Sequence, residues 1–593
     1  MVAVASAALG LLLIGMMLAY ARYGYDFTDE GFYLVRISDP FANAPAVSQF
    51  GIVYYPFYRL LNGGIAELRQ FNLSITFLSG ACLCFVALHQ QKRRFSTPAL
   101  LLVSVAVASM TLLINASFLL TPNYSSLALQ GLILTAIGLI LAQHEAHPWS
   151  VAGWLLTAFG GWLVFLAKLP SAALLAVFAL IYLAAMRKLR LALLLLAVGF
   201  AILLLLGTAL VLDGSIMGFV ERLQRGAARL ASLEGRTISQ ILRWDSFTPD
   251  RIGKLLIFGL AIWTFAVLCL SSADNTLARS AGQMVAVVAG IAGALILFGY
   301  IAIPVQLKPT PRVLVYGPFW GLLAFLMLGF VRRDSKRNAS PPGYPQWPLI
   351  FLLVLLPFVY SVGTNNNYWN TFPDAALFWG IAGCILLFPR QDRVRGAALL
   401  PAWAIILQLP VSIALTTGMQ WPYRQPQPVR SFDGSTEVGA DEARLVMSRD
   451  FATYLDEIRA IMTAHGFAQG DSIIDLSGQS PGVLFALGAN NIGQPWMIGG
   501  YPGSAAFARK VLTSENCEAL GSSWILVEPD GPRSISTDIL ESAGLPFPGS
   551  YEIAGEVMTP VGGGGFARPR QQIIYKPSGS LANIVSICRA NRH

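Results

Sequence analysis

Charged residues are scarce in this sequence. Asp, Glu, Lys and Arg make up 12% of its 593 residues, whereas about a quarter of the residues in a soluble protein are charged. Together with a hydrophobic content of 55%, this scarcity excludes a water-soluble globular protein and indicates a polytopic α-helical membrane protein. The net charge of +9 is then explained by the topology of the loops, and no nucleic-acid partner is expected.

Motifs for metals and nucleotides are missing as well. The five histidines are scattered along the chain, and no spacing of His, Cys and carboxylates typical of a metal site occurs. There is also no G-x-G-x-x-G or Walker pattern. The sequence therefore predicts no metal and no cofactor.

What the sequence has instead is a series of apolar segments long enough to span a membrane. Several are short or contain Gly and Pro, as expected of helices that are buried among others or line a cavity. The sequence predicts about thirteen transmembrane helices, near residues 2–20, 73–90, 98–118, 126–143, 150–167, 171–186, 191–212, 255–272, 281–303, 312–331, 347–362, 374–389 and 396–417.

Basic residues are distributed unevenly between the two sides of these spans. Lys and Arg gather after every second span, as in RKLR (187–190) and RRDSKR (332–337), whereas the opposite short loops carry Lys168, Lys308 and Arg312. The positive-inside rule places the N-terminus in the cytoplasm and the C-terminal part outside. We therefore expect a multi-pass protein of a bacterial cytoplasmic (inner) membrane with a periplasmic C-terminal domain.

The first apolar segment has a second interpretation. Ala19-Tyr20-Ala21 fits the A-x-A pattern of a signal-peptide cleavage site. No basic segment precedes residues 2–20, which favours an uncleaved first span. In either case, residues 21–72 are expected to lie outside.

The first external segment, residues 21–72, begins with an acidic cluster. DFTDEGFYL (26–34) places Asp26, Asp29 and Glu30 just beyond the first span. Carboxylates beside a membrane interface are costly to desolvate, so the cluster needs water, a cation or a chemical role.

A purely structural explanation of the cluster is open as well. In it, Asp26 caps the next helical turn and Glu30 pairs with Arg22 or Arg36. The aromatic segment FGIVYYPFYRLLNGG (50–64) comes next and predicts a loop with a short helix at the interface. The first external segment is therefore expected to form a cap over the bundle.

The second external segment, residues 213–254, contains a row of arginines. In IMGFVERLQRGAARLASLEGR (216–236) apolar residues recur at helical spacing, and Arg222, Arg225 and Arg229 line another face. This pattern predicts an amphipathic helix lying flat in the headgroup region. The arginines suit a bound phosphate or anionic lipid headgroups, and both interpretations stay open.

Two further external clusters carry amides and aromatic rings, which suit sugar hydroxyls and ring C–H groups. TPNYSS (121–126) offers Asn123 and Tyr124, and GTNNNYWN (363–370) offers a longer set. Such turns and interfacial aromatics also occur without a ligand. The longer set comprises Asn365, Asn366, Asn367, Tyr368 and Trp369.

The C-terminal tail differs in composition from the rest. We expect a transmembrane domain over residues 1–418, a Pro-rich linker over 419–440 and an α/β domain over 441–593. A helix-like segment (441–466) precedes segments rich in β-formers. These expected strands are SIIDLS (472–477), SWILVEP (523–529), SYEIAGEVM (550–558) and QQIIYKP (571–577).

One turn in the tail is a candidate anion site. In DLSGQSPGVLFALG (475–488) a strand is expected to run through a Gly-Pro turn into a helix, which can present backbone N–H groups to an anion. The same turn is also ordinary α/β architecture.

The six cysteines divide by topology. Cys517 and Cys588 are the two in the tail, which the expected topology places in an oxidising compartment. The sequence therefore predicts a disulfide between them. The other four fall within predicted spans and are expected to pack as small apolar residues: Cys82, Cys84, Cys269 and Cys384.

Taken together, these features resemble the GT-C superfamily of membrane glycosyltransferases, of the protein O-mannosyltransferase and lipid A aminoarabinose transferase type. In that family the first external loop carries an Asp-Glu pair, matched here by Asp29-Glu30. A His-Pro-Pro-aromatic stretch comes after it, and residues 53–58 match this only in part because the His and one Pro are missing. The resemblance covers the spans and the first loop.

The resemblance implies an inverting transfer of a sugar from a polyprenyl-phosphate donor to a hydroxyl of a lipid, glycan or protein acceptor at the outer face. It implies Asp29 as the base, with Glu30 orienting it or binding the acceptor. The leaving phosphate needs cations, for which the candidates are Lys168, Arg222, Arg225, Arg229, Arg243 and Arg312. Candidate sugar or acceptor contacts are Asp26, Tyr33, Tyr55, Tyr58, Asn123, Tyr124, Asn366, Asn367, Tyr368 and Trp369.

Other functions stay open. The acidic cluster with Asp213 or Asp245 would hold a divalent cation in a metal-dependent, oligosaccharyltransferase-like enzyme. A transporter or flippase of lipid-linked saccharides would show intramembrane charges and internal repeats, of which the sequence has few signs. A sensor or scaffold would leave the acidic first loop unexplained.

Overall fold

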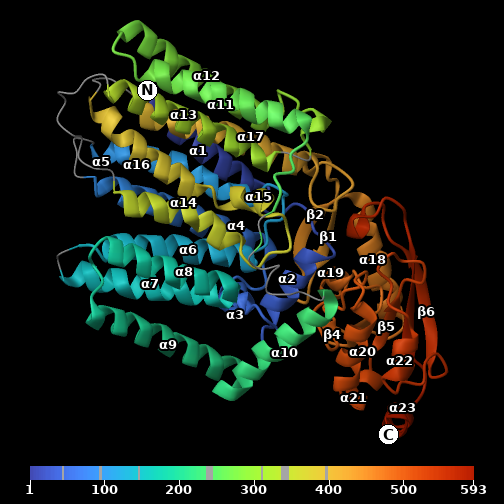
Figure 1. Cartoon of the computed structure of the whole chain (residues 1–593). Coiled ribbons are helices and arrows are strands. Elements are labelled where there is room, and N and C mark those ends of the chain that lie inside the picture. Colours follow the sequence, from blue (N-terminus) through green and yellow to red (C-terminus); the bar gives the residue numbers. More distant parts are fainter. Residues whose placement is uncertain are drawn as a thin grey trace.

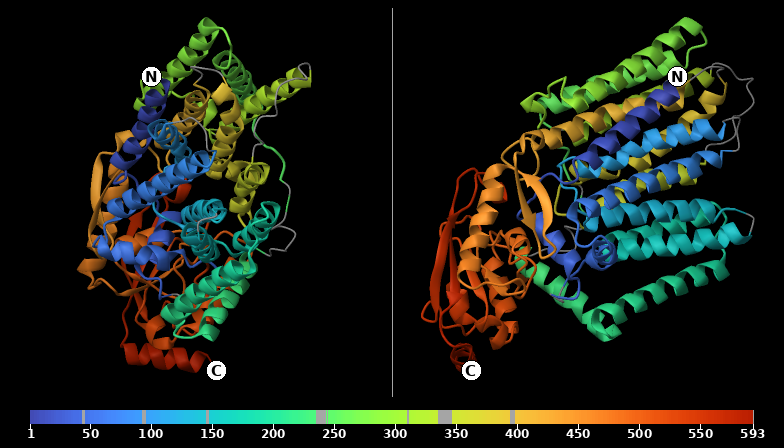
Figure 2. Two further views of the ribbon diagram at one scale, coloured as in Figure 1. Left: turned by 90° about the vertical axis from the view of Figure 1, so that its left-hand side faces the viewer. Right: turned by 180° about the vertical axis from the view of Figure 1, so that it is seen from behind.

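A computed structural model describes the chain except residues 43–45, 92–95, 145–146, 235–242, 244, 309–310, 335–345, 394–397 and 593. Long helices run side by side in one bundle, and a smaller α/β domain covers one end of it (Figures 1 and 2). Some basic residues of the turns used for the orientation, in 92–94, 335–337 and 394–395, lie outside the described residues. The arrangement confirms a polytopic helical protein with a C-terminal α/β domain.

Each of the thirteen predicted spans is mainly helical among the described residues, although residues 299–303 of the span 281–303 lie beyond the end of their helix. Ten helices among the described residues are long and apolar enough to cross a membrane, and the pair of helical segments Tyr368–Ala375 and Leu377–Gln391, bent by 62°, would make an eleventh. Two of the predicted spans are shorter apolar helices, α8 and α14. The bounds are α1 (Val2–Ala19), α4 (Ile65–His89), α5 (Thr97–Ala108) with η1 (Ser109–Asn115), α6 (Tyr124–Leu141), α7 (His147–Ala167), α8 (Leu169–Ala185), α9 (Leu191–Asp213), α11 (Arg251–Ser271), α12 (Thr276–Phe298), α13 (Tyr316–Asp334), α14 (Trp347–Ser361), α16 (Leu377–Arg393) and α17 (Leu399–Gln420).

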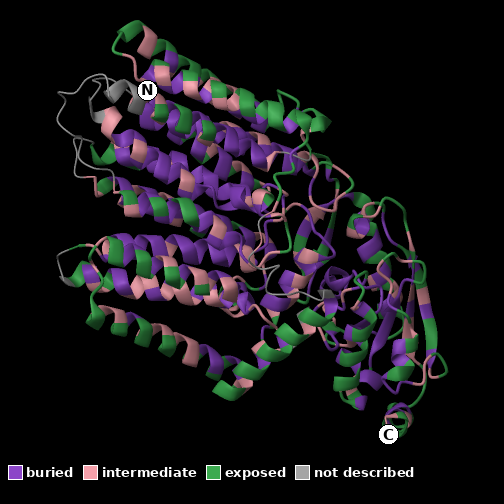
Figure 3. Ribbon diagram, viewed as in Figure 1, coloured by how far each residue is buried: buried purple, intermediate pink, exposed green. Residues whose placement is uncertain are grey.

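The core of the bundle lies around α17. In the most apolar part of α17, 89% of the residues are buried, whereas the values for α9 and α12 at the periphery are 17% and 22% (Figure 3). The buried Gln408 donates hydrogen bonds from Nε2 to the carbonyl oxygens of Ser6 (2.9 Å) and Ala106 (3.0 Å), which joins three helices. The exposed apolar faces of α9 and α12 suit contact with lipid.

The first external segment forms two short helices, α2 (Asp29–Ser38) and α3 (Phe50–Leu60). Acidic residues occupy the first turn of α2 and Arg36 its last turn, which complements the helix dipole. Gly51 permits the close packing of α3 on α2, because a Cβ at this position would lie 2.0 Å from the carbonyl oxygen of Arg36.

The C-terminal domain contains a five-stranded sheet in the order β4-β3-β5-β7-β6. β3 pairs in parallel with β4 and β5, whereas β7 is antiparallel to both β5 and β6. The four predicted strands are present as β3 (Ser472–Asp475), β5 (Trp524–Val527), β6 (Tyr551–Met558) and β7 (Gln571–Pro577), with β4 (Asn490–Asn491) added at the edge. The helices are α18 (Arg449–Ala464), α19 (Pro481–Ala486), α20 (Ser504–Ser514), α21 (Cys517–Gly521), α22 (Asp538–Ser542) and α23 (Leu581–Asn591).

Two boundaries differ from the prediction. A strand, β1 (Gly434–Val438), lies inside the predicted linker and pairs with β2 (Ala443–Met447), where a helix was expected from residue 441. Alternate residues of ARLVM are buried in β2, which is the period of a strand. The helix α18 therefore begins only at Arg449.

The first external segment shares a hydrophobic core with the C-terminal domain. The ring of Phe27 stacks on that of Phe451 with centroids 4.7 Å apart. Tyr25 donates a hydrogen bond from its hydroxyl to the carbonyl oxygen of Gly482 (2.6 Å). A Cβ on Gly31 would lie 2.2 Å from Gly482, so α2 and α19 touch backbone to backbone. The domain therefore fixes the position of α2 and its acidic residues.

The predicted amphipathic helix is present as α10 (Ile216–Glu234). It leads from the outer end of α9 to the C-terminal domain (Figure 1). Its residue Leu233 is buried in the core of that domain, so the domain holds its last turn. Residues 235–236 of the predicted helix lie outside the described residues.

Cysteines 517 and 588 form a disulfide in the structure. Cys517 in α21 and Cys588 in α23 have Cα atoms 5.8 Å apart. The bond joins the last helix to the rest of the domain. Of the cysteines in the predicted spans, Cys84 and Cys384 are buried as expected, whereas Cys82 is exposed.

Candidate functional site

The three carboxylates of the first external segment lie in different environments. Asp26 and Glu30 are each only 3% exposed, whereas the side chain of Asp29 is 27% exposed. The difference arises because Asp29 and Glu30 are consecutive in α2 and so point in different directions. Of the three, Asp29 is the carboxylate that a ligand can reach most easily.

Glu30 forms a buried ion pair with Arg69 of α4. The Nη2 atom of Arg69 lies 2.6 Å from Oε1 of Glu30, and Thr121 donates a hydrogen bond to the same oxygen. Arg69 also donates to the carbonyl oxygens of Ala21 (2.7 Å) and Gly24 (2.9 Å). The structural explanation predicted that Glu30 pairs with Arg22 or Arg36, and this prediction is wrong because the partner is Arg69. The contacts of Arg69 hold the start of the first external segment against α4.

Asp26 is held within its own turn. Its Oδ2 accepts hydrogen bonds from the Thr28 hydroxyl (2.7 Å) and the Glu30 amide (3.3 Å). Burial, followed by the negative charge of Asp29, raises the pKa of Asp26 to about 7, and Arg424 opposes the shift. A carboxyl with this pKa exchanges protons near neutral pH.

Asp29 is oriented by two residues from the predicted linker. Tyr423 donates from its hydroxyl to Oδ2 of Asp29 (2.6 Å), and Nη1 of Arg424 lies 3.0 Å from the same oxygen. Arg424 also donates to the Thr28 hydroxyl and has a positive φ of 52°, a conformation that is unfavourable for a residue with a Cβ. Sequence reasoning missed both residues because it assigned this segment to a linker.

A row of aromatic rings leads away from Asp29. The ring centroids of Tyr33 and Tyr124 are 5.9 Å apart. Tyr33 lies four residues after Asp29 in α2, on the same side of the helix. Burial, then Tyr124, Asp29 and Tyr423, raise the pKa of Tyr33. Both tyrosines were predicted contacts, and the structure brings them together.

Lys168 lies at the far end of this row. Its Nζ atom is 5.5 Å from the ring centroid of Tyr124 and 4.6 Å from that of Tyr360, and it donates to the carbonyl oxygen of Tyr360 (3.1 Å). Burial lowers the pKa of Lys168 to about 8, and the charge of Asp374 opposes the shift. Lys168 is therefore a cation held against two aromatic rings at low exposure.

Arg312 forms an ion pair with Asp374. In η4 (Arg312–Val315), Arg312 lies 3.3 Å from Oδ1 of Asp374, which belongs to η5 (Phe372–Ala375). Both predicted phosphate ligands, Lys168 and Arg312, thus carry charge that acts on Asp374, and Arg312 contacts it directly. Sequence reasoning missed Asp374 because it lies inside a predicted span.

The GTNNNYWN segment is engaged with the second external segment. Arg243 donates from Nη2 to the carbonyl oxygens of Asn365 (3.0 Å) and Asn366 (2.7 Å) and pairs with Asp245 (2.9 Å). The amide of Tyr368 donates to Asp245 (2.7 Å). These contacts hold the turn that leads into α15 (Tyr368–Thr371) and η5. The side chains of Asn367 and Trp369 also donate hydrogen bonds to the backbone of the second external segment. The cluster therefore positions Asp374.

The arginines of α10 occupy other places. Arg222 is buried in an ion pair with Asp213 (2.8 Å), and Arg225 pairs with Glu221 (2.7 Å). Arg229 faces the C-terminal domain and lines a cavity there. Asp213 and Asp245, which the metal-dependent alternative would add to the acidic cluster, are paired with arginines.

The remaining predicted contacts have local roles. Asn123 caps α6, accepting from the amides of Ser125 (2.8 Å) and Ser126 (3.1 Å). Tyr58 donates to Asp441 of the C-terminal domain (3.0 Å). The ring of Tyr55 packs on that of Phe41. The structure does not bring these three side chains into contact with Asp29 within its described residues.

Comparison with known proteins gives distant structural neighbours. No protein-family model and no curated protein matches the sequence. Among solved structures, ArnT from Cupriavidus metallidurans in the apo state shares 14% identity over 96% of this chain and 98% of that chain, with a TM-score of 0.41. ArnT bound to undecaprenyl phosphate shares 15% identity over 97% and 98%, with a TM-score of 0.38.

A third similar structure is the arabinofuranosyltransferase AftD from Mycobacteria, with 14% identity over 96% of this chain and 41% of that chain and a TM-score of 0.37. ArnT and AftD are GT-C glycosyltransferases. This is the superfamily whose spans and first external loop the sequence resembles. At these identities and TM-scores, the likeness carries no residue role over to this chain.

Proposed function

We propose that the protein is an inverting glycosyltransferase that moves a sugar from a polyprenyl-phosphate donor to an acceptor hydroxyl, with Asp29 as the base. The observation that carries the proposal is the row from the partly exposed Asp29 through Tyr33 and Tyr124 to Lys168. It supplies a proton acceptor at one end and a cation at the other, which are the two groups that such a transfer needs.

The geometry at Asp29 suits a general base. Tyr423 and Arg424 both contact Oδ2, which restrains this oxygen. In the proposed mechanism, Oδ1 takes the proton of the acceptor hydroxyl. The hydroxyl oxygen would then attack the anomeric carbon as the bond to the carrier phosphate breaks. In this mechanism Glu30 acts through its ion pair with Arg69, which holds the first turn of α2 in place.

The other end of the row suits the leaving phosphate. Lys168 and Arg312 provide positive charge near one carboxylate, Asp374, and a phosphate arriving there would compete with that carboxylate for the two cations. The charge that develops on the carrier phosphate in the transition state would be stabilised by them. The rings of Tyr33 and Tyr124 would stack against the sugar between the two ends.

The helix α2, which carries Asp29 and Tyr33, lies at the end of the bundle that the C-terminal domain covers (Figure 1). The positive-inside pattern favours this end as the periplasmic side of an inner membrane, where lipid-linked donors and cell-envelope acceptors are used. The acceptor in this proposal is a hydroxyl of a lipid, a glycan or a protein.

A transfer assay tests the proposal. Purified protein in nanodiscs is incubated with a panel of undecaprenyl-phosphate monosaccharides and a cell-envelope acceptor extract, and release of undecaprenyl phosphate is measured. Undecaprenyl phosphate, which one similar solved structure holds, is the carrier to test first. Carrier release with a product of inverted anomeric configuration supports the proposal. Movement of lipid-linked sugar across a proteoliposome bilayer without carrier release would replace it with the transporter alternative.

A further inference from the structure

A cavity lies between α10 and the C-terminal domain, away from the row that starts at Asp29. Its volume is about 620 Å³, and it is lined by the second half of α10, the β4 edge of the sheet and the end of α20. Figure 1 shows α10 ending beside β4 and α20. The lining includes Arg225, Arg229, Lys510, Asn491 and Glu515.

Packing of α10 on the domain places the arginines there. Leu233 belongs to the same hydrophobic core as Phe507 of α20. Gly503, just before α20, permits the contact, because a Cβ at this position would lie 1.9 Å from the carbonyl oxygen of Ser232. Arg229 lies one turn before Leu233 and Arg225 two turns before it, so both face the same side.

The charge in the cavity is mainly positive and incompletely paired. Arg225, Arg229 and Lys510 line it, against one lining carboxylate, Glu515. Arg225 has an exposed pair with Glu221 (2.7 Å), of a kind that contributes little. The Nη1 atom of Arg229 and the Oδ1 atom of Asn491 are buried without a hydrogen-bond partner in the described part of the chain. A buried donor on a guanidinium is costly unless water or a ligand accepts its hydrogen bond.

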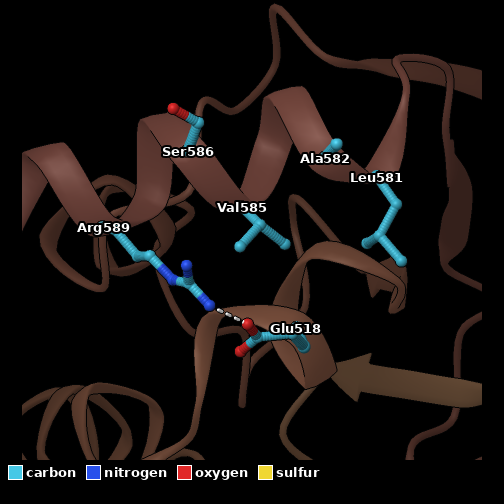
Figure 4. Close-up of a pocket in the computed structure, with 6 residues that line it drawn as sticks. All are labelled: Glu518, Leu581, Ala582, Val585, Ser586 and Arg589. Atoms are coloured by element: carbon cyan, nitrogen blue, oxygen red, sulfur yellow. Dashed lines mark hydrogen bonds and ion pairs between the residues drawn. The ribbon is translucent and has the colours of Figure 1, made fainter.

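A second cavity in the same domain offers a contrast. It has a volume of about 500 Å³ and lies between α21 and α23 (Figure 4). Its one lining cation, Arg589, is paired with the lining carboxylate Glu518. That cavity therefore has no excess of positive charge, and it serves as a matched comparison.

We propose that the cavity between α10 and α20 binds the phosphate monoester of a phosphorylated sugar or of a lipid headgroup. The planar fork of Arg229 suits a phosphate, with Lys510 and Arg225 adding charge. The cavity is larger than one phosphate, and the Oδ1 atom of Asn491 can accept a hydrogen bond from a hydroxyl of the group that carries the phosphate. The proposal does not depend on glycosyl transfer.

Binding is measured directly on the full chain in phosphatidylcholine nanodiscs. Isothermal titration with glucose 1-phosphate, and with glucose as the neutral control, tests a soluble source of the phosphate. Native mass spectrometry of protein in nanodiscs that contain phosphatidic acid tests a lipid source. Arg229→Gln and the exposed Lys510→Gln are compared with Arg589→Gln. Loss of a charged hydrogen-bond partner is expected to weaken binding by about tenfold or more.

Glucose 1-phosphate binding that weakens in Arg229→Gln and Lys510→Gln, but not in Arg589→Gln, supports the site with a soluble ligand. If glucose 1-phosphate does not bind while phosphatidic acid is retained by the wild type and lost from the same two variants, the site takes a lipid headgroup. Binding of neither probe, or binding that is the same in both variants as in the wild type, overturns the proposal.

Discussion

Tyr423 and Asp29 are 394 residues apart in the sequence, and the hydroxyl of Tyr423 lies 2.6 Å from Oδ2 of Asp29. The segment that leaves the last bundle helix therefore completes the environment of the acidic residue in the first external segment. Tyr423 is itself held by a hydrogen bond from its amide to the carbonyl oxygen of Ser117 (2.9 Å). The candidate site thus depends on three distant parts of the chain.

Replacing Tyr423 by Phe or Arg424 by Gln should impair catalysis more than donor binding. Each change removes a donor to the charged Asp29, which costs about 1.5–3 kcal/mol and lowers kcat about tenfold or more. Steady-state kinetics with a polyprenyl-phosphate sugar measure this, with the exposed Tyr501→Phe as the control. Unchanged kcat in both variants would remove the positioning role.

Breaking the buried Glu30–Arg69 pair should destabilise the protein strongly. Glu30→Gln leaves the guanidinium of Arg69, which is 1% exposed, without its charge partner, and the loss of one member of a buried pair costs about 3–5 kcal/mol. Thermal unfolding in detergent measures the loss. Arg449→Gln, which breaks the exposed pair with Asp433, should change stability by at most about 1 kcal/mol, and an equal effect of both variants would contradict the account.

The buried carboxyl of Asp26 should make stability depend on pH. Its pKa is raised from 3.8 to about 7, so between these values the folded protein binds more protons than the unfolded chain and is destabilised as the pH rises. Asp26→Asn lacks this effect and should gain thermal stability relative to the wild type as the pH rises from about 4 to about 7. A difference between the two proteins that stays constant with pH would refute this.

Lys168 should govern binding of the donor. Lys168→Gln removes the ammonium group beside Tyr124 and Tyr360 and is expected to raise the donor KM about tenfold or more. Because the pKa of Lys168 is lowered to about 8, the wild-type donor KM should also rise above this pH as the side chain loses its proton. Lys308→Gln, on another predicted external loop, is the control. A donor KM that is the same in Lys168→Gln and the wild type would exclude the role.

Local patterns were sufficient to predict most of the fold. The apolar segments became helices because their length and hydrophobicity decide this almost without tertiary context. The residues of β2 fall in the helix-like segment 441–466, whereas pairing with β1 and the alternating burial of Leu445 and Met447 decide the structure. Here tertiary contacts override local propensity.

The candidate site was predictable only in part. The acidic cluster stood out because charges are rare in this chain, and Lys168 and Arg312 stood out for the same reason. Glu30 is buried in an ion pair because Arg69 of α4 lies beside it, and the orientation of Asp29 depends on Tyr423. Such contacts between distant segments leave no local pattern in one sequence.

The most direct test of the central claim is the rate of sugar transfer by Asp29→Asn, compared with the wild type and with Asp433→Asn as a matched exposed control. Removing a general base typically costs about 10²–10⁴-fold in rate. We therefore expect transfer by Asp29→Asn to fall by that amount while Asp433→Asn keeps the wild-type rate and both variants fold. Transfer by Asp29→Asn at the wild-type rate would contradict the assignment of Asp29 as the base.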